Sequence, residues 1–204
     1  INEAVRGYAL DVSEDGMFLH VMAEIVRASI LDLRFRLGRA GHILGSCFVH
    51  VSWREPAPFS IIFSGDLGAR NTPLIPDPDP PGACDLLVLE STYGDRLHED
   101  RSQRLERLGT MLARALADKG KVFIPAFALG RTQELLYELD RLFTDPHWLR
   151  EFPGLREKAL PVVVDSPLGL AVTEIYSRLQ QCWDEESRGL TARVMPSAVQ
   201  VSPG

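Results

Sequence analysis

Three short apolar runs bounded by glycine and proline constrain the fold of this chain more than any other feature. They read CFVHVSW (47–53), FSIIFS (59–64) and DLLVLE (85–90). Runs of this length that are rich in Val, Ile and Phe are typical of β-strands. The preceding segment LDLRFRL (31–37) alternates apolar and polar residues, which is the period of a half-buried strand. These four segments predict a sheet in the first half of the chain.

Three polar residues, His42, Asp66 and Glu90, each follow one of these predicted strands. Short connections join antiparallel neighbours, so His42 and Asp66 are expected on the same edge of the sheet. Glu90 joins them if the strand 85–90 points the same way. An imidazole and two carboxylates on one edge resemble part of a metal site. Spacing alone also allows a hydrogen-bonded loop histidine, a turn-forming aspartate and a glutamate that begins a solvated loop.

Five segments together resemble one known family. AGHILGS, SGDLG and LESTYGDR resemble the later motifs of the metallo-β-lactamase fold, in the branch that carries a β-CASP cap. That branch includes RNase J-type nucleases and the endonuclease subunit of the cleavage and polyadenylation machinery. Downstream, KVFIPAFALGRTQELLYEL (121–139) and LPVVVDSPLGLAVTEIY (160–176) are similar to the cap domain. The resemblance implies an α/β chain, with part of a metallo-β-lactamase αββα sandwich followed by an α/β β-CASP cap domain with a parallel sheet.

The order of elements fits two domains. Residues 1–97 are expected to be the part of the first domain that carries the metal loops, and 98–204 an incomplete cap. The link 71–84 holds five prolines and predicts an extended surface crossing. Helices are expected over 14–28 and 99–118. The second half predicts a β-α-α-β-α order, with strands at 121–125 and 162–166 as a parallel pair and helical segments at 131–143, 146–158 and 170–187.

The family pattern implies roles for the three edge residues. His42 would bind one of two zinc ions, Asp66 would bridge both ions at the catalytic centre, and Glu90 would support the site by hydrogen bonding. Members of the family also use a His-x-His-x-Asp-His motif, and this chain has no such string. The chain is therefore expected to be an internal segment of a longer enzyme, without nuclease activity of its own. The remaining histidines do not have that spacing: His20, His50, His98 and His147.

Two residues of the second half are candidates for binding substrate, because ligands bind at the carboxyl ends of strands in open α/β sheets. Arg131 opens a predicted helix, where its charge opposes the positive end of the helix dipole unless it meets an anion. Ser166 precedes a proline after the predicted strand 162–166. The resemblance implies that both loops face the metal site and hold the phosphates of the substrate. The alternatives are an ion pair between Arg131 and Glu134, and a turn or cap role for Ser166.

Composition limits the partners. The net charge is −6, so the chain has no overall attraction for a polyanion. Four arginines recur at helical spacing among acidic residues, which favours a solvated face: Arg101, Arg104, Arg107 and Arg114. No apolar run reaches the ~18–20 residues that cross a membrane. The three cysteines lie far apart, so a disulfide framework is not expected, and a reducing cytoplasm is the expected location.

The resemblance implies that the full-length protein is a zinc-dependent phosphodiesterase that cleaves RNA, expected to be single-stranded. It leaves open the endo- or 5′-exonucleolytic mode, the preference for RNA over DNA and the formation of a homodimer. A non-catalytic homologue that acts as a scaffold or RNA-binding subunit is the alternative. Against it, His42, Asp66 and Glu90 are all present, and a degenerate relative has no physical need for them. A β-lactamase or thioesterase of the same fold would lack the cap.

Overall fold

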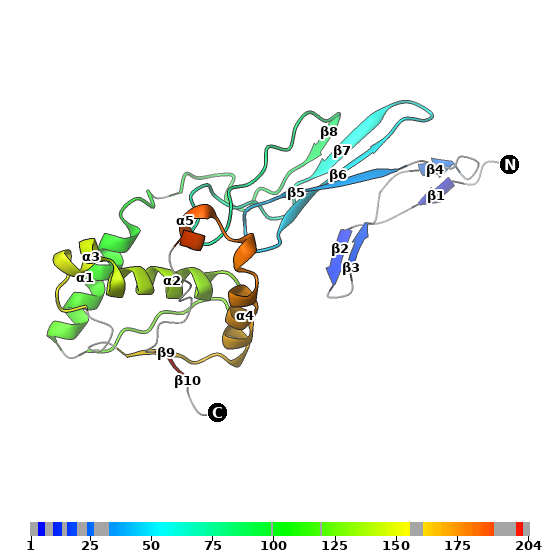
Figure 1. Cartoon of the computed structure of the whole chain (residues 1–204). Coiled ribbons are helices and arrows are strands. Elements are labelled where there is room, and N and C mark those ends of the chain that lie inside the picture. Colours follow the sequence, from blue (N-terminus) through cyan, green and yellow to red (C-terminus); the bar gives the residue numbers. More distant parts are fainter. Residues whose placement is uncertain are drawn as a thin grey trace.

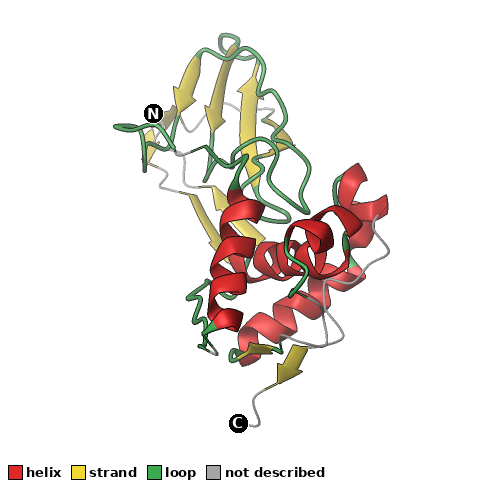
Figure 2. Ribbon diagram, turned by 90° about the vertical axis from the view of Figure 1, so that its left-hand side faces the viewer, coloured by secondary structure: helices red, strands yellow, loops and turns green. Residues whose placement is uncertain are grey.

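The main sheet and the helices of this protein occupy different parts of the molecule. The computed structural model describes residues 4–6, 10–13, 16–19, 24–26, 33–98, 100–118, 120–155, 161–189 and 199–201. In two perpendicular views, the main sheet lies at one end and the helices pack together at the other (Figure 1, Figure 2). The chain is thus a mixed α/β protein. None of the helices in the described segments combines the length and the apolar character that a membrane span requires.

A four-stranded sheet forms the centre of the first half. Its strands are β5 (Arg34–Arg39), β6 (Cys47–Trp53), β7 (Phe59–Phe63) and β8 (Leu86–Val88), adjacent in that order. The pairs β5–β6 and β6–β7 are antiparallel, whereas β7 and β8 run parallel. Consequently β5, β7 and β8 end at the same edge. This confirms the strand directions from which the site was predicted.

The first strand of this sheet is bonded to the proline-rich crossing, and one face of the sheet carries rows of apolar side chains. The proline-rich crossing 71–84 is tied to β5, since Asp79 accepts two bonds from the Arg39 guanidinium and Arg36 donates to the Pro81 carbonyl oxygen at 2.7 Å. On one face, apolar residues from all four strands line up in rows across the sheet. The rows are Phe35, Val51, Ile61 and Leu86, and Leu37, Val49, Phe63 and Val88. The outer members of both rows are exposed.

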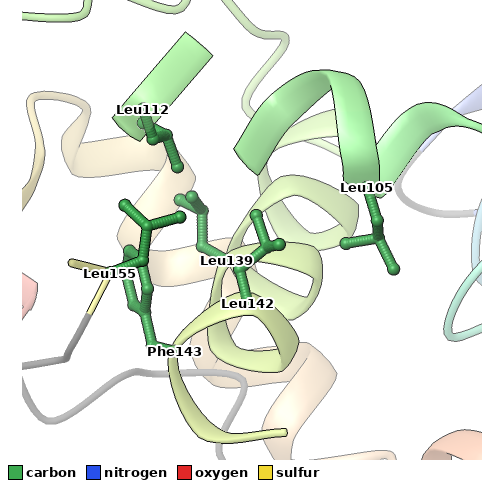
Figure 3. Packing of buried hydrophobic residues seen from close by; sticks show 6 residues of the cluster. All are labelled: Leu105, Leu112, Leu139, Leu142, Phe143 and Leu155. Carbon is green, nitrogen blue, oxygen red and sulfur yellow. The ribbon is translucent and has the colours of Figure 1, made fainter. Parts of the chain in front are cut away.

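The second half packs helices around an apolar cluster. It contains α1 (Arg104–Ala117), α2 (Arg131–Thr144), α3 (Pro146–Glu151), α4 (Pro167–Arg178), η1 (Gln180–Cys182) and α5 (Glu185–Gly189). Leucines at helical spacing on α1 and α2 face one another, which buries both apolar stripes. Figure 3 shows six side chains of this cluster: Leu105, Leu112, Leu139, Leu142, Phe143 and Leu155.

The prediction of a helix over 14–28 is wrong wherever the structure describes that segment. The chain forms β2 (Leu10–Ser13) and β3 (Gly16–Leu19), which pair antiparallel, and β4 (Glu24–Val26), which pairs with β1 (Ala4–Arg6). The helical spacing of Phe18, Val21, Met22 and Ile25 does not decide the structure. Short runs of Val, Ile and Phe fit a strand equally well, and pairing with a neighbouring run decided between the two periods.

The parallel pair of the second half exists, but with a different partner. β9 (Val162–Val164) pairs in parallel with β10 (Val199–Val201), which was not among the predicted strands. The predicted strand 121–125 is wrong, because residues 120–127 are in neither a helix nor a strand. Phe123 is 86% exposed there. An extended run becomes a strand only when a neighbour completes its hydrogen bonds, and β9 has its partner elsewhere.

A second apolar cluster joins the two halves, and we call it the junction cluster. Its buried members come from the proline-rich crossing and from α2, α4 and the end of the helical part: Leu74, Ile75, Tyr137, Tyr176 and Trp183. Leu44, from the loop between β5 and β6, packs against it. Backbone bonds add to this contact, since Asp184 donates to the Leu74 carbonyl oxygen at 3.2 Å. The position of the predicted boundary at residue 97 stays a prediction.

Candidate metal-binding edge

The ends of β5, β7 and β8 bring the three predicted residues to one edge of the sheet. His42 lies in the loop after β5, Asp66 follows β7, and Glu90 follows β8. Backbone bonds extend the parallel pairing past the strand ends, since Ser64 donates to the Val88 carbonyl oxygen at 3.0 Å. The Ser64 hydroxyl in turn accepts from the amide of Glu90 at 2.9 Å. The segments that carry Asp66 and Glu90 are therefore fixed side by side.

The loop 40–46, which we call the His42 loop, is folded by its own backbone. Ala40 donates to the carbonyl oxygen of Ser46, closing the loop at its base. The Ser46 hydroxyl accepts from the amides of His42 at 3.0 Å and Ile43 at 3.2 Å. Gly41 and Gly45 adopt φ angles of +70° and +89°, a conformation that glycine enters without steric cost. Glycine and serine at these positions thus hold the imidazole of His42 at an exposed turn.

A glycine-to-glycine contact locks the His42 loop against the segment after β7. Gly68 donates to the Ala40 carbonyl oxygen at 2.9 Å. A Cβ atom on Gly68 would lie 1.6 Å from the carbonyl oxygen of Gly41 and 2.6 Å from the amide nitrogen of His42. No side chain fits in that space, so any other residue at position 68 would push the two loops apart. The last glycine of SGDLG therefore sets the separation of the loops that carry His42 and Asp66.

Glu90 has a structural task at this edge. Its Oε1 accepts from the amide of Leu67 at 3.0 Å, and its Oε2 accepts from the amide of Thr92 at 3.0 Å. The pKa of the Glu90 carboxyl is lowered mainly by the Thr92 amide, then by the Leu67 amide, with a smaller contribution from the charge of His42. Both oxygens are thus engaged in tying the β7 and β8 loops together. The observed bonds fit the predicted supporting role.

The donor atoms at this edge are a partial set for a metal ion. His42 and Asp66 are exposed, and their side chains form no hydrogen bond or ion pair with the residues that the structure describes. An imidazole nitrogen and a carboxylate oxygen are suitable zinc ligands. Within the described segments, however, no three His, Cys, Asp or Glu side chains are grouped closely enough to hold a metal ion. The described part of the chain therefore offers two candidate donors, and no described third side chain completes a site with them.

Arg131 and Ser166 both have local partners. Arg131 begins α2, and its Nη1 lies 2.7 Å from Oε2 of Glu134, with 52% of the arginine side chain exposed. Ser166 is the N-cap of α4, and its Oγ accepts from the amide of Gly169 at 3.0 Å. The structure thus contains the ion pair and the helix cap that the sequence offered as alternatives. A role in substrate binding stays a prediction for both residues.

The buried side chain of Gln133, which the sequence analysis missed, brings the two candidate substrate loops together. Its Oε1 accepts from the amide of Gly130 at 2.8 Å, and its Nε2 donates to the Ala128 carbonyl oxygen at 3.0 Å. The same nitrogen reaches α4, at Thr173 Oγ1 (2.9 Å) and the Gly169 carbonyl oxygen (3.3 Å). Gln133 is fully buried. The sequence did contain a signal for this role, because Gln133 is a polar residue on the apolar side of a predicted helix. A buried side-chain amide needs hydrogen-bond partners.

The second half also reaches the His42 loop directly. Gly130 has a φ of +81°, and a Cβ atom there would lie 2.8 Å from Cγ2 of Ile43. From α4, the Tyr176 hydroxyl accepts from the amide of Leu44 at 3.2 Å. The turn before α2 and the face of α4 therefore both contact residues next to His42. This contact brings the Arg131 end of α2 close to the candidate metal edge.

A cleft of about 790 Å³ lies beside α1 and α2. Its walls include Arg131, Arg101 and Phe127, but none of the three residues of the metal edge. Arg104 also lines it, and its Nε donates to Oε1 of Glu138 at 2.5 Å. The carboxylate side chain of Glu138 is only 8% exposed. The side chain of Arg104 is 38% exposed, as expected for a solvated arginine face, but it also pairs with a buried acid, which the sequence analysis did not predict.

Comparison with known proteins finds a matching domain and several similar proteins. The Beta-Casp domain matches residues 132–202. Ribonuclease TTHA0252 of Thermus thermophilus is 38% identical over 163 residues, covering 80% of this chain and 34% of that protein. Cleavage and polyadenylation specificity factor 73 of Drosophila melanogaster is 35% identical over 125 residues (61% of this chain, 18% of that protein). Endoribonuclease ysh1 of Schizosaccharomyces pombe is 36% identical over 122 residues (59% and 16%).

The chain thus spans about a third of the bacterial relative and less than a fifth of the other two. The matches cover both the segment with the metal edge and the helical half, since 163 aligned residues exceed either half alone. They agree with the five motifs that pointed to the same family. Residues 132–202 of this chain thus form a Beta-Casp domain, and the chain is similar to nucleases that carry this domain.

Proposed function

We propose that the full-length protein that carries this chain is a zinc-dependent phosphodiesterase that cleaves single-stranded RNA. The observation that carries the proposal is the convergence of His42, Asp66 and Glu90 at one edge of the sheet. Two of these side chains form no hydrogen bond or ion pair with the described residues, and the third holds their loops. The names of the relatives, which are ribonucleases and a cleavage and polyadenylation factor, support RNA as the substrate.

In this proposal His42 and Asp66 are ligands of the metal ions. Bound zinc supplies a Lewis acid for a phosphoryl oxygen and lowers the pKa of water. In our proposal His42 would hold a metal ion through an imidazole nitrogen, and Asp66 would hold metal through its carboxylate. Further ligands would come from elsewhere in the full-length protein, because two donors cannot hold two ions. Glu90 keeps the two loops in register and does not bind metal itself.

Arg131 and Ser166 are proposed to hold phosphates of the RNA. The Arg131 ion pair is more than half exposed on the arginine side, and such pairs contribute little to stability, so a phosphate can replace Glu134. Ser166 Oγ accepts from the amide of Gly169, which leaves its hydroxyl hydrogen for a phosphate oxygen. Contacts of this kind position a nucleic acid strand without reading its bases.

The exposed outer members of the apolar rows, Phe35, Leu37, Leu86 and Val88, support a further part of the proposal. A sheet face of this composition is stable when a second layer covers it. We propose that this sheet is one layer of a metallo-β-lactamase αββα sandwich, completed in the full-length protein. A cytoplasmic location is also part of the proposal. It is supported by three free thiols, Cys47, Cys84 and Cys182.

The proposal is tested with an Asp66→Ala variant of the full-length protein. Zinc content is measured by elemental analysis, and cleavage is measured on labelled single-stranded RNA. We expect zinc to be lost and cleavage to fall by more than about 100-fold, because loss of a ligand exceeds the 10–100-fold effect of supporting residues. Asp118→Ala is the control, since this aspartate follows the C-terminal end of α1, and among the described residues its carboxylate accepts only from the amide of Gly120. Full zinc occupancy in Asp66→Ala would contradict the assignment.

A further inference from the structure

One amide of the His42 loop is bonded by the opposite half of the molecule. The loop closes on itself through Ser46, which accepts from the amides of His42 and Ile43. The next amide, that of Leu44, donates instead to the hydroxyl of Tyr176 at 3.2 Å. The two residues are 132 positions apart in the chain. This bond lies two residues from the imidazole that our proposed function gives to zinc.

Tyr176 is held in place much more firmly than the loop. It is 3% exposed and belongs to the junction cluster with Tyr137 and Trp183. Burial is the main cause that raises the pKa of its hydroxyl, so the group is neutral at physiological pH. A neutral hydroxyl can accept the Leu44 amide without placing a charge in the core. The ring is fixed by packing, and the position of its oxygen therefore follows α4.

Two further contacts hold the His42 loop against the second half of the molecule. The Leu44 side chain packs on the junction cluster. Ile43 touches Gly130, at a spot where a Cβ atom would come within 2.8 Å. Apolar contact and close approach fix how near the loop comes, but neither has a required direction. The hydrogen bond to Tyr176 is directional, so it selects one orientation of the peptide next to His42.

We propose that Tyr176 is a positioning residue for the candidate metal edge. By accepting the Leu44 amide, its hydroxyl orients the turn that presents His42 toward the loop of Asp66. The second half of the molecule thereby helps to set the metal site in the first half, in addition to any contact with substrate. The inference rests on the proposed role of His42 as a ligand. Its first consequence, the fixing of the loop, does not depend on that role.

The test compares Tyr176→Phe with Tyr137→Phe in the full-length protein. Both tyrosines are buried in the junction cluster, at 3% and 6% exposure, and both substitutions remove one hydroxyl. The Tyr137 hydroxyl, in contrast, forms no hydrogen bond to the His42 loop among the described residues. Amide hydrogen exchange of residues 42–46 is measured without metal. Zinc affinity is measured by competition with a chelator, and kcat and KM are measured with single-stranded RNA.

For Tyr176→Phe we expect exchange at Leu44 to be faster by about tenfold or more, since the acceptor is gone. Zinc binding should weaken by about tenfold, as for other residues that orient a ligand, and kcat should fall while KM changes less than about twofold. The protection of the α4 amides against hydrogen exchange should be the same in Tyr176→Phe as in Tyr137→Phe. If the two variants show equal exchange in the loop, or if α4 also loses protection in Tyr176→Phe, the hydroxyl serves the core and the inference is wrong.

The outcome separates this inference from the proposed function. If the wild-type protein binds no zinc, the proposed function fails, and the exchange at Leu44 still reports whether Tyr176 holds the loop. If zinc binds but its affinity is equal in the two variants, the proposed function stands, and the positioning role of Tyr176 is refuted.

Discussion

Polar side chains differ in exposure and bonding between the metal edge and the start of α2. At the metal edge, His42 and Asp66 are exposed, and their loops are held by backbone bonds, by glycine contacts and by the side chains of Ser46 and Glu90. At the start of α2, Gln133 is fully buried and bonds to two separate segments. Glu138, one turn further along, is also buried and paired. The first region keeps side chains available for a ligand, whereas the second uses them to fix the helices.

This difference predicts which substitutions affect stability and which affect only chemistry. A side chain without protein partners can be removed with little effect on folding. Removal of a buried group that satisfies several others leaves those groups unpaired. The loops at the metal edge are therefore expected to tolerate changes of the side chains they present, although they do not tolerate a side chain at Gly68.

The largest expected effect is that of Gln133→Leu. Leucine has a similar volume but leaves the Gly130 amide and the Ala128 carbonyl without partners, at a cost of about 1–3 kcal/mol each. We expect a loss of about 3 kcal/mol in the free energy of unfolding, measured by thermal and urea unfolding of the full-length protein. Asp66→Ala should change it by less than about 0.5 kcal/mol in metal-free protein. Equal losses in the two variants would remove the contrast between the regions.

The sequence predicted the metal edge better than it predicted the buried network. Glycine and proline delimit β6 and β7, so their bounds were predicted within one residue. The common edge then followed from strand direction. Gln133 bonds to Thr173 on α4, 40 residues further along the chain, and Tyr176 on α4 bonds to Leu44, 132 residues earlier. Both bonds depend on where α4 packs, and no local sequence pattern predicts that. Similarly, β9 and β10 pair across more than 30 residues, which short-range periodicity does not reveal.

A smaller effect is expected for Arg131→Ala. If Arg131 exchanges Glu134 for a phosphate, RNA affinity should fall severalfold for all sequences alike. The slope of log affinity against log salt should become shallower by about 0.7, the value for one contact to a single strand. Arg178→Ala is the matched control, because Arg178 is also exposed and paired to a glutamate on its own helix, Glu174. If both variants bind RNA like the wild type, Arg131 is structural and paired with Glu134 only.

The smallest effect concerns the pH dependence of the bonds made by Glu90. Its pKa lies below the ordinary value of 4.5, because the amides of Thr92 and Leu67 stabilise the charged form. A lowered pKa in the folded state means that these bonds stabilise the protein fully above the ordinary value and are lost as the pH falls through the lowered one. In metal-free protein, the amide resonances of Leu67 and Thr92 should therefore shift together with a midpoint below 4.5. In Glu90→Gln this shared titration should disappear, while the glutamine oxygen can still accept one of the two bonds. If the titration persists in Glu90→Gln, another acid controls this edge, and Glu90 does not hold the loops of the candidate site together.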